Sequence, residues 1–161
     1  MALSRLDQLY RAVIVDHYNK PHHYGSLANA SNSIELRNPT CGDVIILYLD
    51  IQDDVIQDVA FAGEGCAIST ASASMMSDLI IGKTLAEAQD LAHTFYDMVT
   101  AKNEDQKQLQ KDLGEAALLA GVKKFPARIK CATLGWKAME GALDDRYGQD
   151  TSLDIEDLEG E

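Results

Sequence analysis

The stretch VIILYLDIQDDVIQDVAFA at residues 44–62 decides the fold, because two strand-like runs flank a short polar turn. The first run, residues 44–51, is rich in β-branched side chains and almost entirely apolar, as a strand with a buried face should be. The second run, residues 55–62, returns with its apolar side chains mostly on one face. Because only Gln52-Asp53-Asp54 separates the two runs, we expect an antiparallel β-hairpin.

Helical patterns surround this hairpin. A further short strand is expected at residues 33–37, before the break at Asn38-Pro39. Apolar residues recur at helical spacing in four segments, which are residues 3–19, 67–81, 85–99 and 125–143. The sequence therefore predicts an α+β domain, in which helices pack on one face of a small antiparallel sheet of about three strands.

One of these helices and two further segments carry additional patterns. Small side chains dominate the first half of the helix at 67–81, which predicts close packing against a neighbouring element. Residues 101–113 are charged and amide-rich, and they fit either an exposed helix or a loose excursion. The predicted domain covers residues 1–147, while residues 148–161 contain six acids and no base and are expected to form a flexible tail.

The composition limits the classes of function. The 161 residues match the roughly 100–200 of one domain, and an apolar fraction of 46% suffices for one core. The formal charge of −12 disfavours binding to a phosphate backbone, which depends on clustered Lys and Arg. The first seven residues show no secretory signal, and no segment reaches the roughly 20 apolar residues that cross a bilayer. We therefore expect a cytoplasmic protein that binds neither nucleic acid nor membrane.

The three cysteines, Cys41, Cys66 and Cys131, each lie at or near the edge of a predicted element. Asp43 follows Cys41 by two residues, so at the mouth of a strand their side chains project to the same side. Three thiolates and one carboxylate make the four ligands of a closed zinc site. The spacing alone leaves a second interpretation open, in which the cysteines are small buried hydrophobic residues.

The local charges favour thiolates at these positions. Cys66 precedes a predicted helix, whose N-terminal dipole stabilises an anion. Lys130 is adjacent to Cys131 and Arg128 is nearby, and both would offset part of the negative charge of the ligand set. The same two cations would also fit a solvated helix face.

Four motifs occur in an order that is similar to the IscU/SufU (NifU N-terminal-like) family of iron–sulfur cluster assembly proteins. They are DHYNKP at 16–21, PTCGD at 39–43, GCAIS at 65–69 and KC at 130–131. The resemblance covers about residues 5–147. It implies an α+β fold, and it makes Cys41, Asp43, Cys66 and Cys131 the counterparts of the family's metal and cluster ligands.

Two departures refine this resemblance. Lys130 stands where the housekeeping scaffold branch has a histidine, and an extra stretch at about residues 99–120 precedes the last helix. Both features look like the SufU branch of Gram-positive bacteria. That branch implies firm zinc binding and transfer of sulfur from a pyridoxal-phosphate cysteine desulfurase of the SufS type.

Three hypotheses for the function follow. In the first, the chain binds zinc through three cysteines and Asp43 and accepts persulfide sulfur on Cys41, as the partner of the desulfurase. In the second, it is a scaffold that assembles an iron–sulfur cluster and transfers it to client or carrier proteins. In the third, it is a binding module whose zinc is purely structural. Whether the chain is an enzyme in its own right stays open.

The remaining polar residues have simpler interpretations. His17 is expected to anchor the first helix, and His93 to lie on a helix surface. The adjacent His22 and His23 are interpreted as solvated loop residues rather than metal ligands. The third motif and the helix that follows it contain three serines, Ser69, Ser72 and Ser74. The sequence offers no evident base to activate them, so a serine nucleophile is not expected.

Overall fold

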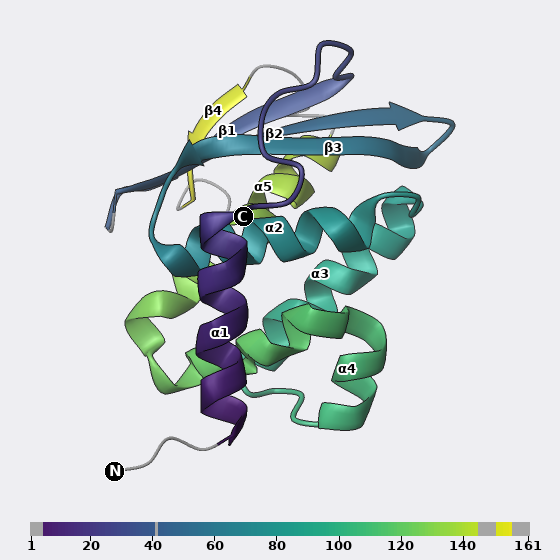
Figure 1. The fold of residues 1–161 in the computed structure, drawn as a ribbon. Helices are drawn as coiled ribbons and strands as arrows, with labels where there is room; N and C mark the ends of the chain where they lie inside the picture. Colours follow the sequence, from purple (N-terminus) through teal and green to yellow (C-terminus); the bar gives the residue numbers. More distant parts are fainter. Residues whose placement is uncertain (1–4, 41, 145–150, 156–161) are drawn as a thin grey trace.

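The hairpin at residues 44–62 forms the centre of a four-stranded sheet in the computed structural model, which describes residues 5–40, 42–144 and 151–155. Figure 1 shows this sheet above a layer of helices. The strands are β1 (Asn32–Asn38), β2 (Asp43–Gln52), β3 (Val55–Glu64) and β4 (Thr151–Asp154). The helices are α1 (Arg5–Asn19), α2 (Ala67–Ile80), α3 (Leu85–Val99), α4 (Gln106–Leu113) and α5 (Ile129–Leu143).

The sheet has the order β3-β2-β1-β4. The three predicted strands pair antiparallel, as expected. Asp53 and Asp54 turn the hairpin with φ values of 54° and 60°, which is the left-handed backbone that a two-residue hairpin loop requires. The fourth strand was not predicted, and it makes the sheet mixed because β4 runs parallel to β1.

Helices cover one face of the sheet, which confirms the predicted α+β architecture (Figure 1). Burial alternates along β2, so every second side chain points into the helical layer. The side chains that fill this layer from β1 and β2 are almost completely buried; they are Ile34, Leu36, Ile45, Leu47 and Leu49. No described helix combines the length and the apolar character that crossing a membrane requires.

The small residues of α2 allow α5 to approach closely, as the sequence predicts. A Cβ added to Gly135 of α5 would lie 3.1 Å from the Cβ of Ala73 of α2. Between the same helices, the Ser72 hydroxyl donates a hydrogen bond to the Ala132 carbonyl at 2.6 Å and accepts one from the Trp136 indole N–H at 3.2 Å. This packing holds the two helices in one rigid layer.

The stretch that precedes the last helix belongs to the core. Asp105 caps α4 by accepting the N–H of Gln108, and Leu109 and Leu113 are fully buried. A 3-10 helix, η1 (Gly114–Lys124), follows and buries five further apolar side chains. The ambiguous segment at 101–113 therefore contains a helix from residue 106, and the last α-helix begins at Ile129 because a 3-10 turn occupies Pro126–Arg128.

The acidic C-terminal segment differs from the flexible tail that its composition predicts. Arg37 of β1 bonds the Asp154 carboxylate at 3.1 Å, and Ile155 is fully buried in the core. Hydrogen bonds to β1 and the apolar side chains of Leu153 and Ile155 thus hold residues 151–155 despite their acidic composition. Residues 148–150 and 156–161 lie outside the described residues, so the expectation for them is untested.

Candidate metal centre

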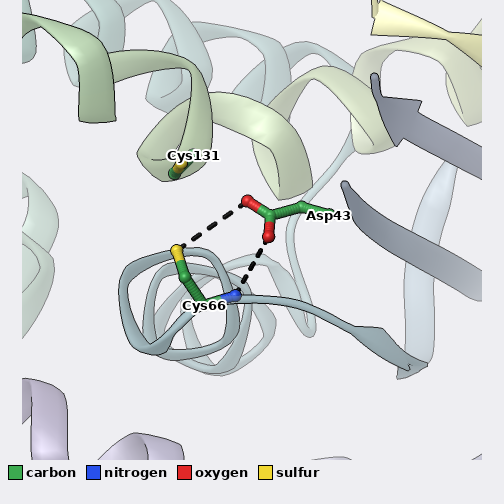
Figure 2. Close-up of side chains that lie close together, drawn as sticks. All are labelled: Asp43, Cys66 and Cys131. Carbon is green, nitrogen blue, oxygen red and sulfur yellow. Dashed lines mark hydrogen bonds between the residues drawn. The ribbon is translucent and has the colours of Figure 1, made fainter. Parts of the chain in front are cut away.

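Asp43 is a buried carboxylate at the first position of β2, with only 3% of its surface exposed. Its Oδ1 accepts the backbone N–H of Cys66 at 3.0 Å, and its Oδ2 lies 3.8 Å from the Cys66 Sγ (Figure 2). The preceding Gly42 has a φ of +76°, which a residue with a side chain rarely adopts. The turn into β2 therefore directs a carboxylate into the protein, towards the start of α2.

Cys66 is the N-cap residue of α2. Its backbone is extended, and its Sγ accepts the N–H of Ser69 at 3.5 Å, in the way that a capping oxygen usually does. A Cβ on the preceding Gly65 would lie 2.3 Å from the Ser69 Oγ and 3.4 Å from the Asp43 Oδ1. The absence of a side chain at Gly65 thus allows the backbone to pass close to the candidate ligands.

Cys131 lies in the first turn of α5 and is fully buried. One possible ligand atom from each of Asp43, Cys66 and Cys131 lies within 4.8 Å of the other two. A strand and two helices therefore bring together three residues that are distant in the sequence (Figure 2). Two thiols and a carboxylate are donors that zinc accepts, so these residues fit such an ion. Cys41 lies outside the described residues, and its place in this centre stays a prediction.

The two expected supporting cations lie at the start of α5. Arg128 is exposed and lines an apolar groove of ≈ 310 Å³ together with Tyr10, Ile14 and Ile68. Lys130 is half-buried and directly precedes Cys131. This position is consistent with an electrostatic role near the thiols, which remains a prediction.

Tyr10 of α1 is a residue that the sequence analysis did not single out. Its hydroxyl is buried and has no hydrogen-bond partner among the described residues. Burial raises the pKa of this phenol, and a thiolate at Cys66 raises it further. The ring packs against Gly121, where an added Cβ would lie 3.1 Å from the Tyr10 Cδ2. In the sequence, Tyr10 looks like one more residue of an amphipathic helix.

We expect Tyr10→Phe to raise the free energy of unfolding by up to about 1 kcal/mol, because it removes a desolvated hydroxyl without leaving a cavity. Urea denaturation of the metal-free protein measures this change. Tyr18→Phe is the matched control, because the Tyr18 side chain is exposed and the substitution should change little. A clear loss of stability for Tyr10→Phe would instead mean that the hydroxyl has a bonding partner.

One serine does lie beside a histidine, contrary to the sequence analysis. The Ser74 Oγ is 2.7 Å from the His17 Nδ1, and the His17 Nε2 is 3.4 Å from the Glu115 Oε1. However, Ser74 is fully buried and His17 is 1% exposed, and the same Oγ accepts the backbone N–H of His22. A substrate cannot reach this serine, so the three residues join α1, α2 and η1, and the expected anchoring role of His17 fits its position.

Comparison with known proteins gives a consistent picture. The pattern of the NifU-like N-terminal domain family matches residues 9–145. An iron–sulfur cluster assembly scaffold protein IscU of Streptococcus pyogenes serotype M1 is 54% identical, over 89% of this chain and 87% of its own length. The zinc-dependent sulfurtransferase SufU of Bacillus subtilis (strain 168) is 50% identical, over 85% of this chain and 90% of its own length.

The fold has solved counterparts as well. A crystal structure described as an iron–sulfur cluster assembly scaffold protein for the SUF system, from Fervidobacterium islandicum AW-1, superposes with a TM-score of 0.78. It is 37% identical, and the match covers 85% of this chain and 98% of that one. The described architecture is therefore one that experiment has already found in a similar chain.

Proposed function

The chain belongs to the NifU-like N-terminal domain family, and on this premise we propose that it is an iron–sulfur cluster assembly protein that binds zinc and accepts persulfide sulfur from a cysteine desulfurase. The observation that carries the proposal is the convergence of Asp43, Cys66 and Cys131 within 4.8 Å. The names of similar proteins support the pathway, since they include both a cluster assembly scaffold and a zinc-dependent sulfurtransferase. The cytoplasmic location expected from the sequence is part of the same proposal.

Zinc, when bound, would hold its cysteine ligands as thiolates. The contacts of Asp43 support a role in such a centre, because one oxygen accepts the Cys66 N–H while the other lies near the Cys66 sulfur. Cys66 and Cys131 are each built into the start of a helix and are suited to stay on the metal. We assign the fourth ligand position to Cys41.

Cys41 is also our candidate for the sulfur acceptor, because it lies in the glycine-containing motif PTCGD at 39–43, which the sequence predicts to be a loop. The Cys41 thiolate would form a sulfur–sulfur bond with the terminal sulfur of a persulfide on the desulfurase. The old sulfur–sulfur bond breaks, the desulfurase cysteine leaves as a thiolate, and the transferred sulfur keeps its proton. No net oxidation occurs, so the step needs no further reactant.

The test is turnover of a pyridoxal-phosphate cysteine desulfurase of the SufS type in the presence of this protein. We expect the native protein to accelerate alanine release and to gain the mass of one sulfur atom on Cys41. Cys41→Ser should abolish both effects, whereas the neighbouring Thr40→Ser, which keeps every cysteine, should leave them intact. If Cys41→Ser stimulates turnover as well as the native protein does, sulfur transfer through Cys41 is wrong.

A scaffold function is the second candidate, because the similar Streptococcus pyogenes protein carries that name. In this case the cluster is the cargo, and it would be assembled at the same residues and passed to client or carrier proteins. Metal analysis and visible absorbance of anaerobically purified protein separate the two functions. A colourless protein with one zinc supports sulfur transfer, while a brown protein with iron and acid-labile sulfide supports the scaffold. A protein that contains zinc but does not change the turnover of the desulfurase would favour the third hypothesis, in which the zinc is purely structural.

A further inference from the structure

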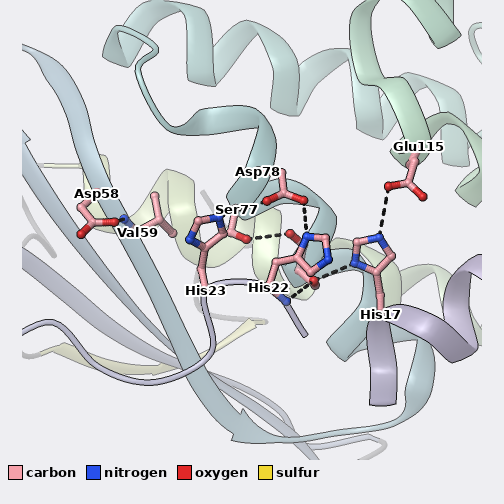
Figure 3. Close-up of polar contacts among 9 residues, drawn as sticks. His17, His22, His23, Asp58, Val59, Ser77, Asp78 and Glu115 are labelled. Carbon is pink, nitrogen blue, oxygen red and sulfur yellow. Dashed lines mark hydrogen bonds and ion pairs between the residues drawn. The ribbon is translucent and has the colours of Figure 1, made fainter. Parts of the chain in front are cut away.

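Two histidine side chains converge on one carboxylate away from the candidate metal centre. The His22 Nδ1 lies 2.5 Å from the Asp78 Oδ2, and the His23 Nε2 lies 3.0 Å from the Asp78 Oδ1 (Figure 3). The histidines follow α1 in the chain, and Asp78 lies near the C-terminal end of α2. Because Cys66 directly precedes α2, Asp78 lies twelve positions after it, which is about 18 Å along a helix. The two clusters are therefore separate.

The backbone holds both histidines against α2. The His22 N–H donates to the Ser74 Oγ at 2.7 Å, one helical turn before Asp78. The His23 carbonyl accepts the N–H of Phe61 at 3.0 Å, which ties the loop to β3 as well. His23 has a φ of +56°, so the chain reverses there and two consecutive side chains reach the same carboxylate. In an extended chain, consecutive side chains would point to opposite sides.

The cluster is open to solvent and lies beside further ligand-type groups. The side chains of His22, His23 and Asp78 are 43%, 32% and 41% exposed. The His17 ring lies 4.5 Å from the His22 ring, with Glu115 on its far nitrogen. Exposed contacts between a histidine and a carboxylate contribute little to stability, so these side chains can exchange Asp78 for another partner at little cost while the backbone hydrogen bonds hold the loop.

We propose that His22, His23 and Asp78 form a second, labile site for a divalent transition-metal ion. Two imidazoles and one carboxylate are the donor set of non-haem Fe2+ sites, and they also accept Zn2+ and Co2+. To bind the ion, both imidazoles are neutral and present the nitrogens that now contact Asp78. Among the described residues, only Asp43, Cys66 and Cys131 have ligand atoms that all lie within 4.8 Å of one another. The exposed side chains of His22, His23 and Asp78 would therefore rotate on binding, so that two nitrogens and one carboxylate oxygen reach a single ion and water completes its coordination. The proposal does not depend on sulfur transfer or on cluster assembly.

The probe is Co2+, added to protein whose cysteine centre already holds one zinc. Calorimetry should detect one Co2+ per chain, with the weak visible bands of nitrogen and oxygen ligands and without intense thiolate charge-transfer absorption. His22→Ala, His23→Ala and Asp78→Asn should each abolish this binding event. His93→Ala is the matched control, because the His93 side chain is 71% exposed on α3 and should not affect binding.

A second measurement keeps the test valid if a variant fails to fold. The chain has four histidines, so their imidazole signals can be followed individually by NMR in the native protein. Co2+ should broaden the signals of His22 and His23 at low occupancy and leave that of His93 sharp. Absence of a second binding event, thiolate bands, or broadening that spares His22 and His23 would each overturn the proposal.

Discussion

Gly63→Ala should cost at least about 4 kcal/mol of the free energy of unfolding, a large share of the roughly 5–15 kcal/mol of a typical domain. Gly63 pairs with Ile45 in the β2–β3 ladder and has a φ of +131°. An added Cβ would lie 2.1 Å from the Val44 carbonyl oxygen and 3.0 Å from its carbon. These are backbone atoms of the paired strand, so they cannot move away unless the ladder opens next to Asp43.

Gly82→Ala is the matched control for this clash. Gly82 also has a left-handed backbone, with a φ of +82°, but nothing lies within 4 Å of an added Cβ. This substitution should therefore cost only the conformational penalty of about 1–2 kcal/mol. Urea denaturation of both variants without metal measures the difference. Equal losses in the two variants would show that backbone conformation, and not the contact with Val44, makes Gly63 necessary.

Asp43→Asn and Asp43→Ala should both weaken zinc binding by more than the roughly 10–100-fold that loss of an outer-shell partner causes, because each removes the carboxylate that we propose as a direct ligand. The two variants should differ in the stability of the metal-free chain. Asparagine keeps an oxygen for the Cys66 N–H, whereas alanine leaves that N–H without its acceptor. Without metal, the free energy of unfolding of the alanine variant should therefore be about 1–3 kcal/mol lower than that of the asparagine variant.

Competition with a chromophoric chelator measures the zinc affinity, and urea denaturation measures the stability. Asp50→Asn is the control, because Asp50 lies on the same strand at its far end from the metal centre. Unchanged zinc affinity in both Asp43 variants would remove this residue from the ligand set. A stable alanine variant with weakened zinc binding would keep the ligand role and reject the structural one.

The sequence by itself determined those elements whose conformation is set by residues adjacent in the chain. The apolar, β-branched run at 44–51 and the turn at 52–54 specify the hairpin, because strand propensity and turn chemistry act over a few residues. The same holds for Thr84 and Glu87, which form a capping box at the start of α3. The motifs around Asp43, Cys66 and Cys131 also identify the candidate ligands before any distance is known.

Other features were decided only by tertiary structure. Residues 151–154 become a strand because β1 offers a free edge more than 100 residues earlier in the chain, and Ile155 finds a place in the core. Leu109 and Leu113 settle the ambiguous segment by burial in the same way.

The same distinction separates the two clusters of polar residues. Asp43, Cys66 and Cys131 were recognisable as candidate ligands because their motifs are local, although the arrangement that brings their ligand atoms within 4.8 Å is not. His22 and His23 resembled solvated loop residues because their partner, Asp78, lies 55 or more positions away. The Tyr10 hydroxyl, which has no hydrogen-bond partner in the described part of the chain, likewise became visible only in the packed core. Local patterns record the conformation of neighbouring residues, whereas contacts between distant residues depend on how the helices and strands pack.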